Sequence, residues 1–226
     1  MCGRYSFASD KNQLKKQFGN LEYGQNLEIN FNVAPTQKGY IIADNAPDAL
    51  QQFKWGLIPF WAKDEKIGGR MINARSETIL EKPAFRQAAR HRHCLVIADS
   101  FYEWSKKNTT KIPYRILPKD DSLLVMAGIW ESWQGPEESV YSFSIITCPP
   151  NEDMNGIHDR MPVIFHQDSE WQAWLEEKDP QAITELLQTP VQGLLKMYPV
   201  STRVNSVRNN GPVLHQAVEE QRDLFS

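Results

Sequence analysis

Short apolar runs separated by turn-forming residues make up much of the chain. Runs of this length, rich in β-branched and aromatic residues, are typical of strands. The predicted strands are residues 40–43, 50–55, 94–98, 114–117, 123–130 and 141–147. Residues 131–139 join the last two runs and contain a Gly-Pro pair, so these runs are predicted to form a hairpin.

Helical patterns interrupt the strands at irregular intervals. Ser9 and Asp10 can cap a short helix that carries Leu14 and Phe18 on its inner face. The other expected helices are residues 78–90, limited by Pro83, then 169–177 and 180–188. Clustered strands with irregularly inserted helices predict an α+β fold: a mainly antiparallel, irregular barrel-like sheet with inserted and flanking helices.

No repeat, low-complexity tract or long linker divides the chain, so residues 1–226 are expected to form one domain. The sequence lacks regular βαβ alternation and the glycine-rich phosphate-binding motifs, which argues against a Rossmann or P-loop enzyme. It also lacks a signal-peptide core and an apolar run of the ~20 residues that a membrane span needs. We therefore expect a cytoplasmic protein with no membrane contact.

Three cysteines lie far apart in the sequence, at positions 2, 94 and 148. Their odd number and spacing argue against a disulfide framework and against a zinc site with CxxC spacing, so no metal is expected. The charge is unevenly distributed: residues 1–115 hold 18 basic and 11 acidic residues, and residues 116–226 hold 7 and 17. This asymmetry allows a local basic surface that attracts phosphates, unless the two halves interleave and their charges mix.

Cys2 is a candidate nucleophile because methionine is normally removed when the second residue is small. The exposed N-terminal cysteine would carry a thiol and an α-amine on adjacent carbons, with ordinary pKa values of ~8.5 and ~7.7–8.0. The amine can form an imine with an aldehyde, and the thiol can then close a five-membered thiazolidine ring. The second attack is intramolecular, so little entropy is lost. The alternative is an incidental small residue at a frayed terminus.

Three further segments carry candidate chemistry, each with a structural alternative. Asn73 could hydrogen-bond a sulfur or sugar oxygen, and Arg75 suits bidentate phosphate contact, unless they are a capping residue and a surface ion pair. Glu103 lies between two aromatic residues, which should desolvate it and raise its pKa, unless it is exposed on an edge strand. His158 is titratable near neutral pH and has an acidic neighbour, although most loop histidines have no catalytic role.

Taken together, these segments resemble the SRAP (SOS response-associated peptidase) family of abasic-site sensors. The matching stretches are MCGRY at the N-terminus, NVAPTQ at 32–37, FKWGLIPFWAK at 53–63, INARSET at 72–78, ADSFYEW at 98–104, IITCPPN at 145–151, IHDRMP at 157–162 and YPVSTRVNSVRNNGP at 198–212. The resemblance covers about residues 2–212 and leaves residues 213–226 as a C-terminal tail. It also implies an irregular barrel-like α+β fold.

The resemblance implies a role for each matching residue. Cys2 would bond to the sugar aldehyde of an abasic site in single-stranded DNA, and Asn73 would orient Cys2 or the sugar. Glu103 would move protons during imine formation and ring closure, and His158 would help to open the sugar. The expected DNA contacts are phosphate binding by Arg4, Arg75 and Arg160 and an apolar wall of Trp55, Pro59, Phe60 and Trp61. Neither cofactor nor metal is implied.

Two other functions remain open at this point. The first is a cysteine hydrolase with Cys2 as nucleophile and His158 or Glu103 as base, whose minimal reaction would be removal of its own Met1. The second is a non-catalytic single-strand binder in which Cys2 is inert. We expect a monomer that associates with the nucleoid when it binds DNA.

Overall fold

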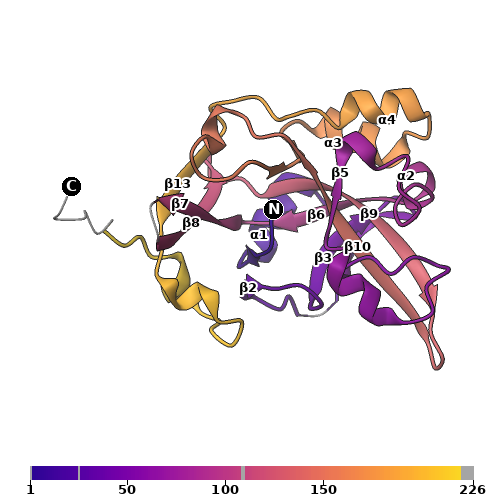
Figure 1. Cartoon of the computed structure of the whole chain (residues 1–226), viewed down its shortest axis with the longest axis horizontal. Coiled ribbons are helices and arrows are strands. Elements are labelled where there is room, and N and C mark those ends of the chain that lie inside the picture. The colour runs from indigo at the N-terminus through magenta and orange to yellow at the C-terminus, as the bar shows by residue number, and fades with distance from the viewer. Residues whose placement is uncertain (1, 25, 108–109, 220–226) are drawn as a thin grey trace.

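The computed structural model describes residues 2–24, 26–107 and 110–219 as two β-sheets flanked by short helices (Figure 1). The first sheet has the strand order β13-β8-β7-β1-β2. Its strands are β1 (Tyr5–Phe7), β2 (Asn30–Val33), β7 (Ser100–Lys107), β8 (Thr110–Pro118) and β13 (Leu195–Pro199). All its pairings are antiparallel.

The second sheet closes on itself. The strands follow the order β10-β4-β3-β6-β9, and β9 pairs again with β10, which completes a five-stranded barrel-like ring. The ring is built from β3 (Lys38–Ala43), β4 (Ala46–Trp55), β6 (His93–Ala98), β9 (Leu124–Gln134) and β10 (Ser139–Cys148). Three short strands add to it: β5 (Asn73–Arg75) and β11 (Met161–Pro162) on β10, and β12 (Ile164–Phe165) on β9. The predicted α+β class with a mainly antiparallel, barrel-like sheet is confirmed.

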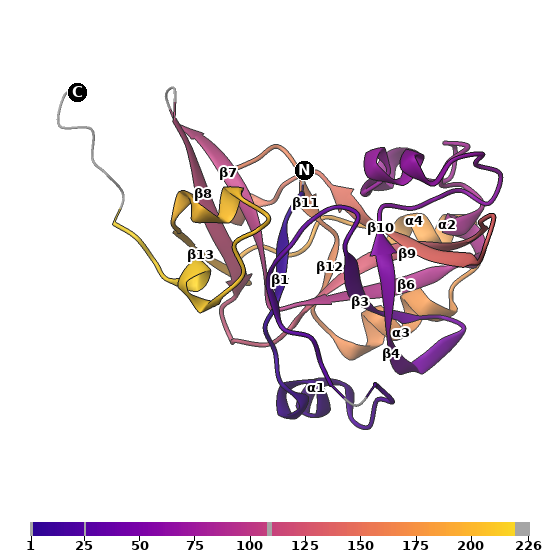
Figure 2. The same cartoon turned by 90° about the horizontal axis from the view of Figure 1, so that it is seen from below.

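The helices lie outside the barrel, as Figure 2 shows from below. They are α1 (Lys11–Phe18), α2 (Ala88–His91), α3 (Asp168–Glu176) and α4 (Pro180–Leu186). Asp10 caps α1 by accepting hydrogen bonds from the backbone N–H groups of Asn12 and Gln13, as its sequence predicted. None of the helices in the described ranges is long and apolar enough to span a membrane.

The helix expected over residues 78–90 is wrong. Turns occupy most of this segment, and only Ala88–His91 is helical. Pro83 has no backbone N–H and its ring collides with the preceding turn, which strongly disfavours a continuous helix through this position. Residues 212–215, most of which belong to the C-terminal tail that the resemblance leaves uncovered, form a 3₁₀ turn whose Leu214 is buried against Tyr102 and Val200.

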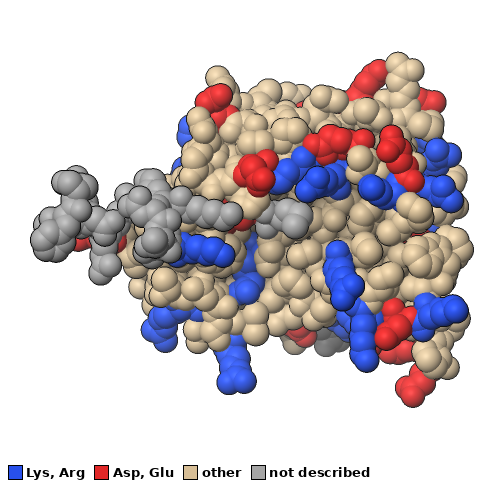
Figure 3. Space-filling view, in the orientation of Figure 1, with Lys and Arg blue, Asp and Glu red and all other residues tan. Residues whose placement is uncertain are grey.

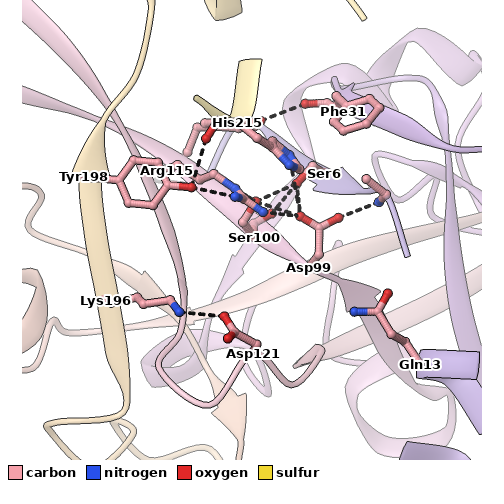
Figure 4. A network of polar contacts seen from close by, with 12 residues as sticks. Ser6, Gln13, Phe31, Asp99, Ser100, Arg115, Asp121, Lys196, Tyr198 and His215 are labelled. Atoms are coloured by element: carbon pink, nitrogen blue, oxygen red, sulfur yellow. Dashed lines mark hydrogen bonds and ion pairs between the residues drawn. The ribbon is translucent and has the colours of Figure 1, made fainter. Parts of the chain in front are cut away.

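A network of polar side chains joins β1, β7 and β8 (Figure 4). Asp99 pairs with the Arg115 guanidinium at 3.1 Å and accepts hydrogen bonds from the Ser6 and Ser100 hydroxyls at 2.5 and 2.9 Å. Arg115 also donates to the Tyr198 hydroxyl on β13 at 2.6 Å. Because the two charges are paired and hydrogen-bonded, the network can be buried, and it fixes β1 relative to β7.

Candidate functional site

Cys2 is buried three residues before β1, near Asn73 of the second sheet and Glu103 of the first. The Tyr102 N–H donates to the Arg4 carbonyl at 2.9 Å, and Tyr5 pairs with Phe101, so the N-terminal residues run alongside β7. The predicted removal of Met1 concerns a residue outside the described ranges.

Asn73 contacts the backbone of Cys2 directly. It lies in β5, which pairs in parallel with β10 so that Asn73 is opposite Ile145. Its Nδ2 donates to the Cys2 carbonyl at 2.8 Å. Its Oδ1 is buried and accepts no hydrogen bond from any described residue. Asn73 therefore holds Cys2 with one end of the amide and leaves an acceptor beside it with the other.

Glu103 is buried on β7, and burial raises its pKa to about 7. The sequence predicted the direction of this shift, but not its cause. Side chains alternate along a strand, so Tyr102 and Trp104 point to the opposite face from Glu103 and pack with Val200 and Val204. The protein interior on the Cys2 side of β7 desolvates the carboxyl group, which can therefore hold a proton at neutral pH.

Burial raises the pKa of the Cys2 thiol well above its ordinary range, and the nearby Glu103 carboxylate raises it further. A thiol in this setting is protonated at neutral pH, which disfavours direct attack by a free thiolate. The thiol is better suited to closing a ring on an electrophile that is already attached to the neighbouring amine.

His158 lies in the loop that precedes β11, with its Nε2 3.9 Å from Glu103 Oε2. The loop is held against β7 by the Ser105 hydroxyl, which donates to the Gly156 carbonyl at 3.2 Å. His158 Nδ1 lies 2.8 Å from Asp159 Oδ1 and 3.0 Å from the Arg160 backbone nitrogen. An unprotonated Nδ1 accepts from Arg160 N–H, and a protonated Nδ1 pairs with Asp159, so this environment accommodates both states of the ring.

A cavity of about 390 Å³ opens onto Glu103 and His158, whereas Cys2 and Asn73 do not line it. It is lined by Glu103, Trp104, Lys111, His158 and Asn205. Trp104 and Asn205 were not predicted as site residues, although both lie in stretches that carry the family resemblance. A larger cavity of about 580 Å³ lies between α1, α3 and β13 and is lined by none of the predicted site residues. In the ranges described, no three His, Cys, Asp or Glu side chains are grouped to hold a metal ion.

The three predicted phosphate-binding arginines differ in their surroundings. Arg75 is exposed, and no carboxylate among the described residues pairs with it at 4.0 Å or less. Arg160 is paired with Glu77, and its Nη2 also donates to the Thr147 carbonyl at 2.5 Å. Arg4 is half-buried and donates hydrogen bonds to Asn32 and to the Val204 carbonyl. Arg75 is thus the one of the three that can reach a phosphate without giving up a contact inside the protein.

The four residues of the predicted apolar wall differ in their exposure to solvent. Trp55 is fully buried, and its Nε1 donates to the Ile72 carbonyl at 2.9 Å. Pro59 is also buried, whereas Phe60 and Trp61 are 56% and 49% exposed. Trp55 ends a barrel strand and faces the core, so the structure differs from the expectation that it stacks on a base. Phe60 and Trp61 alone keep exposed faces for stacking.

The chain matches one family model and several proteins of known sequence or structure. The model for "SOS response associated peptidase (SRAP)" matches residues 1–207. The abasic site processing protein YoqW of Bacillus subtilis is 45% identical over 95% of this chain and 98% of its own. The abasic site processing protein HMCES of Xenopus tropicalis is 34% identical over 78% of this chain and 59% of its own. A Bacteroides thetaiotaomicron crystal structure, 27% identical, covers 96% of this chain and all of its own, with a TM-score of 0.85.

Proposed function

The chain belongs to the SOS response associated peptidase (SRAP) family, and from this membership we propose that it processes abasic sites in single-stranded DNA by bonding covalently to them through Cys2. The observation that carries the proposal is the grouping of Asn73 and Glu103 at the buried Cys2, with His158 3.9 Å from Glu103. A chemically inert binding protein has no need to place a proton-holding carboxyl group beside a cysteine.

The proposed bond forms in two steps. With Met1 removed, the α-amine of Cys2 adds to the C1′ aldehyde of the ring-opened deoxyribose, and the carbinolamine loses one water to give an imine. The thiol then adds across the C=N bond: sulfur bonds to C1′, and the thiol proton passes to nitrogen. The product is a thiazolidine, and its formation releases one water overall. The second step is fast because the thiol is already attached to the reacting group.

Each surrounding residue has a role that fits its position. Asn73 fixes the Cys2 backbone with its Nδ2, and its Oδ1, to which no described residue donates, can accept a hydrogen bond from the α-amine. Glu103 can donate the proton that the leaving water needs, because its raised pKa keeps it partly protonated near pH 7. His158 lies beside Glu103 at the cavity and can open the cyclic hemiacetal form of the sugar.

The hydrolase alternative fits the site less well. A cysteine peptidase needs a base that deprotonates the thiol. Burial and the Glu103 charge instead raise the pKa of the Cys2 thiol, and the His158 ring is within 4 Å of Glu103 and Asp159. This arrangement favours amine-first chemistry over thiolate attack on a peptide.

The experiment that tests the proposal is incubation of the protein with an oligonucleotide that carries one abasic site. We expect an adduct that survives heat and denaturant, with a mass equal to protein plus DNA less one water. Intact mass spectrometry should also show that the active protein begins at Cys2. No adduct under these conditions, or adduct formation by protein that keeps Met1, would exclude the thiazolidine. Cleavage of peptide substrates without an adduct would support the hydrolase.

Arg75→Ala is expected to weaken non-covalent binding to single-stranded DNA. Loss of one phosphate contact should reduce the slope of log K against log salt by ~0.7 for a single strand. Fluorescence anisotropy over a salt series measures this slope, and Arg90→Ala, an exposed arginine on α2, is the matched control. An unchanged slope would assign Arg75 a structural role. Equal affinity for duplex and single-stranded DNA would contradict the proposed substrate.

A further inference from the structure

The segment of residues 201–211, which follows β13, forms a loop at the edge of the cavity and is called the arginine loop below. It begins with the 3₁₀ turn Thr202–Asn205 and carries two arginines, Arg203 and Arg208. The loop is the yellow segment at the lower left of Figure 1. Its sequence belongs to a stretch that carries the family resemblance, yet the covalent chemistry at Cys2 uses none of its side chains.

Buried polar groups hold this loop from beneath. Asn32 on β2 is buried, and its Nδ2 lies within hydrogen-bond distance of three loop carbonyls: Val204 at 3.3 Å, Ser206 at 3.0 Å and Asn209 at 2.9 Å. Arg4 Nη1 donates to the Oδ1 of Asn32 at 2.8 Å. The same nitrogen also donates to the Val204 carbonyl at 2.7 Å. Asn32 thus uses its amide N–H groups on the loop carbonyls and its oxygen on Arg4, and these contacts together fix the loop backbone in one conformation.

This arrangement assigns Arg4 to the support of the loop. The family resemblance implied that Arg4 binds a phosphate. Its guanidinium is instead half-buried and donates hydrogen bonds to Asn32 and to the loop backbone. Burial lowers the pKa of Arg4, as expected for a cation that is partly withdrawn from water. Arg4 is therefore not available to bind a phosphate unless it gives up these contacts.

The outer surface of the arginine loop is basic and free to bind. Arg203 and Arg208 are exposed, and no carboxylate among the described residues lies within ion-pair distance of either. They are two of only seven basic residues in positions 116–226, which hold 17 acidic ones. Figure 3 shows basic side chains over this segment at the lower left, whereas acidic and basic side chains lie side by side at the upper right.

The loop is also continuous with the cavity. Asn205 lines the cavity together with Glu103 and His158, and its Oδ1 accepts from Trp104 Nε1 at 2.8 Å. Lys111 on β8 lines the same cavity, so a cationic side chain lies on another strand as well. A strand whose sugar enters this cavity must leave it past one of these walls, and its phosphates carry one negative charge each.

We propose that the arginine loop binds the backbone phosphates of the DNA strand next to the lesion, through Arg203 and Arg208. The inference rests on the proposed function, because it takes single-stranded DNA as the ligand. Because Asn32 and Arg4 fix the loop backbone, its guanidinium groups can bind phosphates with little loss of backbone entropy. Phosphate contacts of this kind position the DNA strand but do not depend on its base sequence.

The test is a salt series of binding to an intact single strand without an abasic site. Arg203→Ala/Arg208→Ala is expected to lower affinity and to reduce the slope of log K against log salt by ~1.4, which corresponds to two single-strand contacts. Arg203→Lys/Arg208→Lys should restore most of the slope, because lysine keeps the charge. The matched control, Arg86→Ala/Arg90→Ala, removes two exposed arginines at and just before α2 and should leave the slope unchanged.

Two outcomes would overturn the inference: an unchanged slope in Arg203→Ala/Arg208→Ala, or an equal loss in the control pair, which would mean that net charge alone sets affinity. Thermal unfolding of each variant shows whether the loop is still folded. The binding assay contains no aldehyde, so it succeeds or fails independently of the chemistry at Cys2. Failure of the wild-type protein to crosslink abasic DNA would instead overturn the proposed function.

Discussion

Replacing Cys2 by alanine is expected to abolish the heat-stable adduct with abasic single-stranded DNA, while binding to intact single strands stays nearly unchanged. The thiol closes the ring that makes the adduct persistent, whereas the phosphate contacts belong to other residues. Alanine keeps the α-amine, so a reversible imine can still form, and borohydride should trap a small amount of it. Denaturing gels with and without the reductant measure both products.

The other two cysteines provide matched controls for this variant. Cys94 and Cys148 are free and buried, and burial raises the pKa of the Cys148 thiol to about 11. Cys94→Ala should therefore crosslink as the wild type does. A heat-stable adduct formed by Cys2→Ala without reductant would show that another nucleophile, most simply a lysine, carries the reaction.

The sequence predicted the barrel strands well because their burial is visible locally. Continuous apolar runs such as 94–98 must be covered on both faces, and β6 is buried along its whole length. The short strands β1, β2 and β5 were not predicted, since three or four residues show no period of their own. They are strands only because of their pairing: β1 pairs with the longer β7, β5 pairs with the longer β10, and β2 pairs with β1 at the edge of the sheet.

The candidate site was predicted from motifs, and the structure adds what motifs cannot show. The resemblance implied that Asn73 orients Cys2 or the sugar, but not that its amide donates to the Cys2 carbonyl, because that contact depends on the parallel pairing of β5 with β10. The sequence also could not show that Trp55, which was expected to stack on a base, is buried in the core. Whether an aromatic side chain on a strand faces the core or the solvent depends on the register of the barrel.

Substitutions of Glu103 and His158 are expected to slow different steps of crosslinking, because the two residues act in different steps. Abasic deoxyribose is mostly a closed hemiacetal, so a group that opens the ring controls how fast the aldehyde appears. His158, with 24% of its side chain exposed at the cavity, can exchange a proton with the sugar oxygen. Glu103 is almost fully buried beside Cys2, where it can protonate the oxygen that leaves as water.

His158→Ala should crosslink abasic DNA more slowly, by ~10²–10⁴-fold, the usual contribution of a positioned acid or base. An oligonucleotide with a permanently open aldehyde should restore the rate of His158→Ala but not that of Glu103→Gln. Crosslinking time courses on both substrates measure this, with His166→Ala as an exposed histidine control. Equal rescue of both variants, or of neither, would contradict the division of roles and leave Cys2 as the nucleophile.

The dependence on pH separates the two residues again. On the open aldehyde, wild-type rates should fall as pH rises through about 7, because the acid form of Glu103 is lost there, and Glu103→Gln should lack this decline. Folding raises the pKa of Glu103 from 4.5 to about 7, so the folded protein favours the protonated carboxyl group. The stability that protonated Glu103 contributes is therefore lost as pH rises through about 7, where the buried group ionises. Glu103→Gln should therefore unfold at a higher temperature than wild type at pH 8. A slow variant that is also less stable at this pH would indicate that Glu103 supports the fold and does not transfer protons.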